Sequence, residues 1–339
     1  MPLRNKNSDA ERLSDYSLHT ENPSKGRNYH MEKKFCMKAL CSELVFGLTV
    51  LAFVSLAGTA RVAIAAQGKL DSAKIEQLTG MKGEMNEKEG VLTVRAPRTD
   101  LQVTTAGVKM NPAMGLTSYA AFMKAGDKTM LMGDTTLLED QVNPVMSVAL
   151  DSGLEVTALH NHFFWDSPKV MFMHIGGMGD EEKLAAAVGK VFAKIKETSG
   201  GKGEIPKADL DPAKTSLDPK NIEGIMGMKG QLASGVYKIT IGRTTKMGGH
   251  EVGNAMGINT WAAFVGSDQQ AVVDGDFVML EKELQSVLKA LRGAGINVVA
   301  IHNHIETESP RIVFLHYWGV GTTTDLAKGL KAALDTQRK

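Results

Sequence analysis

A tandem repeat constrains the fold of this chain more than any other feature of its sequence. The triplet His-Asn-His at 160–162 returns at 302–304, and the pair Ser-Pro at 167–168 returns at 309–310. Both motifs recur at the same offset of 142 residues, and flanking segments on either side also match. A constant offset over so long a stretch predicts two copies of one domain.

The repeat pattern also gives the domain boundaries. We assign residues 68–198 to the first repeat and residues 221–339 to the second. The segment 199–220 between them is rich in glycine and proline, a composition typical of a linker.

The N-terminal segment resembles an export leader. Three lysines at 33, 34 and 38 precede an apolar run at 44–57, and Ala63-Ile64-Ala65 fits a small-residue cleavage site. We therefore expect a leader over residues 1–65, with the signal peptide proper at 31–65. The mature protein is expected to be soluble and periplasmic or secreted, with no transmembrane span after cleavage.

Composition excludes some classes of site and partner. The only cysteines, Cys36 and Cys41, lie within the predicted leader, so the mature part has no thiolate site or disulfide. The formal net charge is +1, so the protein has no strong positive potential that would attract nucleic acid. The expected partner is a small molecule or a cell-envelope ligand.

The residue patterns of the first repeat predict α+β domains. Helices are expected at 72–79, 139–151 and 180–196, and strands at 91–95, 101–105, 119–124, 129–132, 154–162 and 169–175. This order favours a largely antiparallel sheet with helices on one face.

Histidines are concentrated in the repeated motifs, and this points to metal binding. Two histidines at i and i+2 on a strand face the same side, and a third from a neighbouring strand would complete a zinc-type site. The candidate metal ligands are His160, His162 and His174 in the first repeat, and His302, His304 and His316 in the second. The cofactor that fits this donor set best is a divalent metal, Zn²⁺ foremost.

Four charged residues at matching positions are candidates for further ligands or substrate contacts. Glu139 and Glu281 follow a Gly-Asp pair in each repeat and are alternative carboxylate ligands. Lys169 and Arg311 follow the shared proline and are candidates for contacting an anion. Solvent-exposed charges at strand ends are the alternative interpretation of the last two.

Strand register decides whether the histidines converge. A tight hairpin loop between the two histidine-bearing strands would pair His160 with Met171 and turn His174 to the opposite face. A looser register or a bulge would bring the three rings together. The alternative to a metal site is a polar seam in which the histidines bond to backbone groups.

The motifs that carry these residues resemble a known family. The pattern A-L-H-N-H, S-P-[KR]-x-x-x-x-H-x-x-G-x-G and the upstream M-G-x-x-[ST]-[YW]-A-A-F and G-D-x-x-x-L-E segments resemble the LppY/LpqO family. That resemblance covers both repeats and implies an exported bacterial domain of unknown function. It assigns no catalytic residue.

Two classes of function follow. The first is a pair of histidine-coordinated metal-binding domains, extending to a metal-dependent lyase or hydrolase acting on a small molecule. The second is a non-catalytic module that binds an envelope component or another ligand, with structural histidines. A variant of the first is metal handling, in which methionines join the ligands. Whether the protein is an enzyme stays open at this point.

Overall fold

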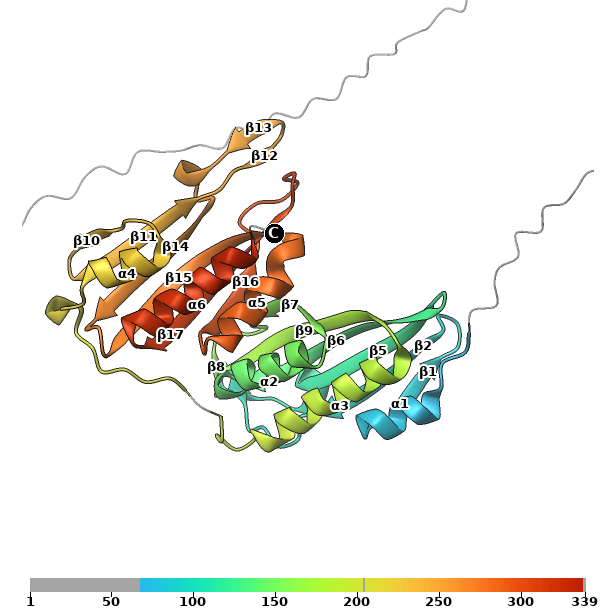
Figure 1. Cartoon of the computed structure of the whole chain (residues 1–339). Helices are drawn as coiled ribbons and strands as arrows, with labels where there is room; N and C mark the ends of the chain where they lie inside the picture. The colour runs from blue at the N-terminus through green and yellow to red at the C-terminus, as the bar shows by residue number, and fades with distance from the viewer. Residues whose placement is uncertain (1–67, 204, 338–339) are drawn as a thin grey trace, which may run out of the picture. The chain divides into compact units, whose positions relative to one another are not determined.

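The structure is a computed structural model that describes residues 68–203 and 205–337. The predicted leader, residues 1–65, lies outside the described residues. Figure 1 shows the chain coloured from its N-terminus to its C-terminus. Among the described residues, no helix combines the length and apolar character that crossing a bilayer requires.

The first repeat contains three α-helices and nine strands. Its elements are α1 (Ser72–Thr79), β1 (Gly83–Asn86), β2 (Val91–Pro97), β3 (Thr104–Thr105), β4 (Val108–Lys109), η1 (Pro112–Met114), β5 (Thr117–Ala125), β6 (Lys128–Leu138), α2 (Glu139–Asp151), β7 (Glu155–His160), β8 (Asp166–Ser167), β9 (Val170–Gly179) and α3 (Glu181–Glu197).

The second repeat has a closely similar order of elements. After η2 (Pro212–Lys214) come α4 (Pro219–Met226), β10 (Gln231–Ala233), β11 (Val236–Gly242), β12 (Thr245–Met247), β13 (His250–Val252), η3 (Asn254–Met256), β14 (Asn259–Gly266), β15 (Ala271–Leu280), η4 (Glu281–Glu283), α5 (Leu284–Gly293), β16 (Asn297–His302), β17 (Ile312–Gly321) and α6 (Thr323–Thr336).

Local sequence explains why the helices begin where they do. The Asp180 carboxylate accepts a hydrogen bond from the Lys183 backbone N–H and caps α3. Beyond this cap, Leu184, Val188 and Val191 recur at helical spacing and are buried against the sheet. The expected helices at 72–79, 139–151 and 180–196 are therefore confirmed to within a residue or so.

The strands expected at 129–132 and 169–175 are longer in the structure, where β6 runs to Leu138 and β9 to Gly179. Two other expected strands are shorter in the structure. The strand expected at 101–105 exists only as the two residues of β3, because Leu101 and Val103 instead fill a small apolar cluster. The strand expected at 154–162 ends at His160, because the chain leaves the sheet there to form the loop before β8.

The large sheet joins both repeats into twelve strands. Its order is β1-β2-β5-β6-β9-β7-β16-β17-β15-β14-β11-β10, and every strand pair is antiparallel. Counted inward from the two ends of the sheet, equivalent strands of the two repeats occupy equivalent positions. The duplicated domain is thus repeated about a local pseudo-two-fold axis between β7 and β16. The α+β fold class is confirmed.

The two faces of the sheet differ in what covers them. Leu131, Leu159 and Met173 point to the helices and belong to the main core, which continues through both repeats. The alternating residues between them, including Asp134 and His174, point to the opposite face. Figure 1 shows the helices of the first repeat lying over one side of its strands.

The junction between the repeats is held by reciprocal side-chain bonds. Leu159 of β7 pairs with Ile301 of β16. Asn143 of α2 donates to the Val298 carbonyl at 3.1 Å and accepts from the Val298 N–H at 2.8 Å.

An equivalent pair of bonds runs in the opposite direction across the junction. Gln285 of α5 donates to the Val156 carbonyl at 2.8 Å and accepts from the Val156 N–H at 3.0 Å. The register of β7 on β9 shifts just after Val156, and that of β16 on β17 shifts just after Val298. The residue pair that joins β7 to β16, Leu159 with Ile301, does not include either valine. Each repeat therefore supplies the side-chain amide that bonds to the N–H and C=O of a buried valine in the other.

Candidate metal centre

Strand register brings histidines of neighbouring strands together on the open face. His160 pairs with Phe172, not with Met171 as a tight hairpin would require. A bulge between Val156 and Ala158 then sets Ala158 opposite His174. The second repeat has the same register, with His302 opposite Phe314 and Ala300 opposite His316. The looser register considered from the sequence is therefore the one found.

The second repeat gathers a compact set of donor atoms. The Nε2 atoms of His304 and His302 lie 3.1 Å apart, and His304 Nε2 lies 3.4 Å from Asp276 Oδ2. One ligand atom from each of these three residues lies within 4.8 Å of the others. Donors on a tetrahedral Zn²⁺ at 2.0–2.1 Å are about 3.3 Å apart, so the separations of 3.1 and 3.4 Å match edges of a coordination polyhedron.

His316 adds a fourth donor beside this set. Its ring stacks on that of His302 with centroids 4.8 Å apart. Its Nδ1 lies 3.3 Å from the Gly275 carbonyl oxygen, so an Nδ1–H donated to this oxygen leaves Nε2 free to ligate. Backbone contacts of this kind fix the tautomer of metal-binding histidines.

The first repeat holds the equivalent rings in a slightly different arrangement. Here the close pair is His160 Nε2 and His174 Nε2, at 3.0 Å. His160 Nδ1 lies 3.4 Å from the Asn161 carbonyl oxygen, which again leaves Nε2 for other partners. The His162 ring lies 5.1 Å from that of His160 and stacks on Phe172 at 3.4 Å. The predicted trio therefore gathers in this repeat too.

A phenylalanine supports each cluster from a small core of its own. Phe172 belongs to an apolar cluster with Leu101 and Val103, on the face away from the helices. Phe314 occupies the matching position in the second repeat, and the His304 ring stacks on it at 3.5 Å. Stacking on a rigid, buried ring limits the orientations open to His162 and His304.

Sequence reasoning missed the carboxylates that the structure places at these sites. Asp134 pairs across the sheet with His174, and Asp276 pairs with His316. Both aspartates are buried, and an Oδ1 atom of each has no hydrogen-bond partner among the described residues. The signal in the sequence is the Gly-Asp pair that recurs at 133–134 and 275–276.

Burial controls the charge of the groups in the second cluster. Desolvation raises the pKa of Asp276 above its ordinary value, although His316 and His304 oppose this. Desolvation, with the neighbouring His316 and His304, lowers the pKa of His302 to about 4. Desolvation also lowers the pKa of His162 in the first repeat. At neutral pH, His302 and His162 are therefore in the uncharged form that binds metal ions.

The other predicted contacts lie beside the clusters or apart from them. Glu139 begins α2 and lines a pocket with Ile205 and Trp318, away from the histidines. Lys169 forms an ion pair with the buried Asp166 at 3.3 Å. The side chains of Glu281 and Arg311 approach each other to 3.8 Å at the mouth of a different pocket.

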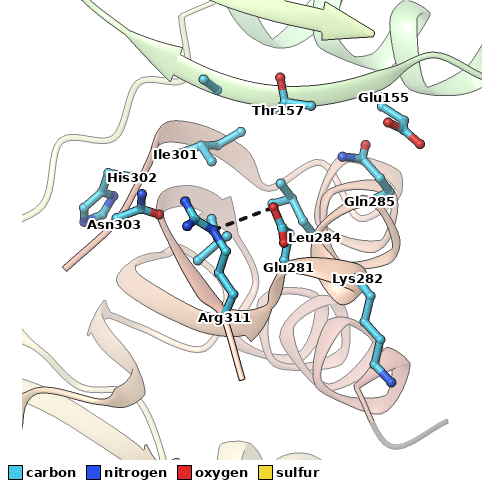
Figure 2. A pocket seen from close by; sticks show the side chains of 12 residues that line it. Glu155, Thr157, Glu281, Lys282, Leu284, Gln285, Ile301, His302, Asn303 and Arg311 are labelled. Carbon is cyan, nitrogen blue, oxygen red and sulfur yellow. Dashed lines mark ion pairs between the residues drawn. The ribbon is translucent and has the colours of Figure 1, made fainter. Parts of the chain in front are cut away.

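That pocket, of about 400 Å³, lies between the repeats and is lined in part by His302. Figure 2 shows the Arg311 side chain between Asn303 and Glu281, with Thr157 of the first repeat on the opposite wall. The equivalent pocket of the first repeat is partly walled by Ile205 and Pro206 of the linker. The linker thus makes the two otherwise equivalent pockets different.

Comparisons with known proteins identify the family but no activity. A search of curated proteins finds no match. Among solved structures, the crystal structure of the trimeric bacterial microcompartment shell protein PduB is similar at 12% identity. The match covers 75% of this chain and 89% of that one, with a TM-score of 0.18, a value too low to carry any argument about fold or function.

The model of the Domain of Unknown Function (DUF1259) matches this chain twice, at residues 73–194 and at residues 220–336. The two matches together cover more than half of the sequence and coincide with the two copies of the histidine and aspartate cluster. The chain therefore belongs to the DUF1259 family and carries two tandem copies of its domain.

Proposed function

We propose that each repeat binds one divalent transition-metal ion, Zn²⁺ by preference, through its histidines and its buried aspartate. In the second repeat the donors are Asp276, His302 and His304, with His316 beside them. In the first repeat they are the equivalent Asp134, His160, His162 and His174. Imidazole and carboxylate donors together suit Zn²⁺.

One observation carries this proposal. Asp276 is 4% exposed, its Oδ1 has no hydrogen-bond partner among the described residues, and two imidazoles lie next to it. Burying a carboxylate without full hydrogen bonding is costly. A cation held between the carboxylate and the imidazoles offsets that cost. A purely structural polar seam would instead satisfy these atoms with protein groups.

The proposal extends to a reaction on a small molecule at the metal ion. A bound Zn²⁺ supplies Lewis acidity and an activated water, which is the chemistry of metal-dependent lyases and hydrolases. Arg311 and Asn303 line a pocket whose other walls include Ile301 and Leu284 of the helix-covered core, so this pocket is not the place where a substrate would meet the metal donors. We propose such a reaction as the function of the second repeat. The alternative is a module that binds ligands without turnover.

The leader and the motif resemblance support two further parts of the proposal. The basic segment, apolar run and small-residue site before residue 66 favour export to the periplasm or beyond. N-terminal sequencing of the mature protein tests this. The shared motifs favour placing these domains in the LppY/LpqO group.

The metal content of the purified protein tests the central proposal. The chain is to be expressed without an affinity tag, because tag histidines bind metals. It is then stripped with a chelator, reloaded with Zn²⁺, desalted and analysed for metal. We expect about two zinc ions per chain. Protein that retains no zinc above the level of a histidine-free control protein would contradict the proposal.

Replacing Asp276 by asparagine should have opposite effects on the apo and zinc-loaded protein. Without metal, the change removes a buried charge and should raise the free energy of unfolding by about 1 kcal/mol. With zinc, it removes a ligand and should lower the stabilisation that zinc gives. Thermal unfolding of both forms checks this, with Asp274→Asn, a substitution of a neighbouring exposed aspartate, as the matched control. An equal shift of the unfolding temperature in the apo and zinc-loaded forms would argue against a ligand role for Asp276.

A further inference from the structure

The histidine clusters of the two repeats face the same side of one sheet and meet at the repeat junction. The pairing of Leu159 with Ile301 sets the register of β7 against β16. Antiparallel pairing then places Ala158 opposite His302 and His160 opposite Ala300. Residues that lie opposite one another on neighbouring strands form a row across the sheet. In each of the two rows that contain these alanines, one alanine lies between a histidine of one repeat and a histidine of the other.

The register gives the spacing of the clusters. His174 and His302 lie on either side of Ala158 on a row of three strands, so their Cα atoms are about 10 Å apart, or two strand spacings. His160 and His302 are diagonal neighbours on adjacent strands, about 8 Å apart. By the pseudo-two-fold relation, His160 and His316 lie on either side of Ala300 in the same way.

The strip of sheet between the clusters is open. Ala158 and Ala300 are both partly exposed and present only methyl groups. His162 and His304, at the outer side of each cluster, are exposed. A small molecule can therefore lie across β7 and β16 with one end at each cluster and meet no larger side chain on these two rows.

We propose that the two metal ions form one composite centre, about 10 Å apart, whose ligand is a small linear molecule with an anionic group at each end. This inference rests on the proposed function, because it requires both metal sites. The spacing exceeds the 3.5–4 Å of sites in which two metals share one bridging atom. A molecule with two separated carboxylates can instead coordinate both ions, and its second contact benefits from the high effective concentration created by the first.

The spacing can be measured with copper in place of zinc. Protein loaded with Cu²⁺ at both sites should show dipolar broadening in its electron paramagnetic resonance spectrum, because dipolar coupling falls with the cube of distance. His162→Ala and His304→Ala, each of which changes an exposed ligand of one site, should remove the broadening. His250→Ala changes an exposed histidine outside both clusters and should retain it.

The outcomes separate the two proposals. Two bound copper ions without broadening would overturn the composite centre and leave the proposed metal sites standing. Failure to bind copper or zinc at all would overturn the proposed function itself. Broadening that persists in both single-site variants would also count against the composite centre, because the coupling would then arise from other sites.

Dicarboxylates test the ligand class. Binding of suberate, octanoate and succinate to the zinc-loaded protein is to be compared by calorimetry. We expect suberate to bind at least about tenfold more tightly than octanoate, because only suberate has a second carboxylate that reaches the other ion. The advantage should vanish in His162→Ala and in His304→Ala. Equal affinities for suberate and octanoate in the unaltered protein would overturn the proposed ligand.

Discussion

Alanine at both His302 and His304 should reduce the bound zinc from about two ions per chain to one. The two imidazoles provide neighbouring donor atoms of the second cluster, 3.1 Å apart, and Asp276 and His316 alone cannot complete a tight site. Changes to outer partners of a metal ligand already cost 10–100-fold in affinity, so loss of two direct ligands should weaken this site by more than about 100-fold. Metal analysis and competition with a chromophoric chelator measure both quantities.

The duplication provides a matched partner for this experiment. His160→Ala with His162→Ala makes the equivalent change in the first repeat and should leave the second site loaded. His250→Ala, which alters the exposed histidine of β13, should keep both ions. If the double variants both retained two tightly bound ions, the histidine clusters would not be the metal sites. Circular dichroism of the apo variants establishes that the fold is intact.

Leucine at Asn143 or at Gln285 should destabilise the protein by about 2–4 kcal/mol each. Each amide satisfies both backbone groups of a buried valine in the other repeat, and leucine can satisfy neither. An unsatisfied buried donor or acceptor costs about 1–3 kcal/mol. Val156 and Val298 are at most 1% exposed, which allows water little access to replace the lost bonds. Urea unfolding measures the change in free energy.

The two substitutions should act on the same junction from opposite sides. The double variant is expected to lose more stability than either single variant, and protease cleavage in the segment between the repeats should then separate the two halves. Gln102→Leu, at an exposed position, is the control and should change stability little. Loss of less than about 1 kcal/mol in both single variants would show that the reciprocal bonds do not hold the junction.

The sequence predicted the elements of each repeat better than their relations to one another. Helices α2 and α3 follow from capping and periodicity, which are local properties. The register of β7 against β9 depends on how the loop after His160 folds through β8 and pairs with β3. That pairing involves residues more than sixty positions apart, and a hydrophobic pattern carries no information on it.

The residues of the candidate site were also predictable only in part. The six histidines stood out because nearly all the histidines of the body fall in two repeated motifs. Asp134 and Asp276 did not, because an aspartate after glycine usually indicates a turn, whereas both lie within long strands. Only the cross-strand pairing with His174 and His316 reveals their role. The reciprocal bonds at the junction could not be predicted from the repeat either, because Asn143 and Gln285 are different residues at equivalent positions.

The strand order of the sheet is the same from both ends, which suggests a simple way to build such a protein. A chain with only one of these repeats would leave the outer edge of β7 without a neighbouring strand and the backbone N–H and C=O of Val156 without their amide partner. Two such chains related by an exact two-fold axis would each supply the neighbouring strand and the amide to the other. The present polypeptide has the architecture that joining the two halves of such a homodimer in one chain would give. In a single chain each half can carry its own loops, and here the segment after His162 is aromatic whereas the one after His304 is acidic.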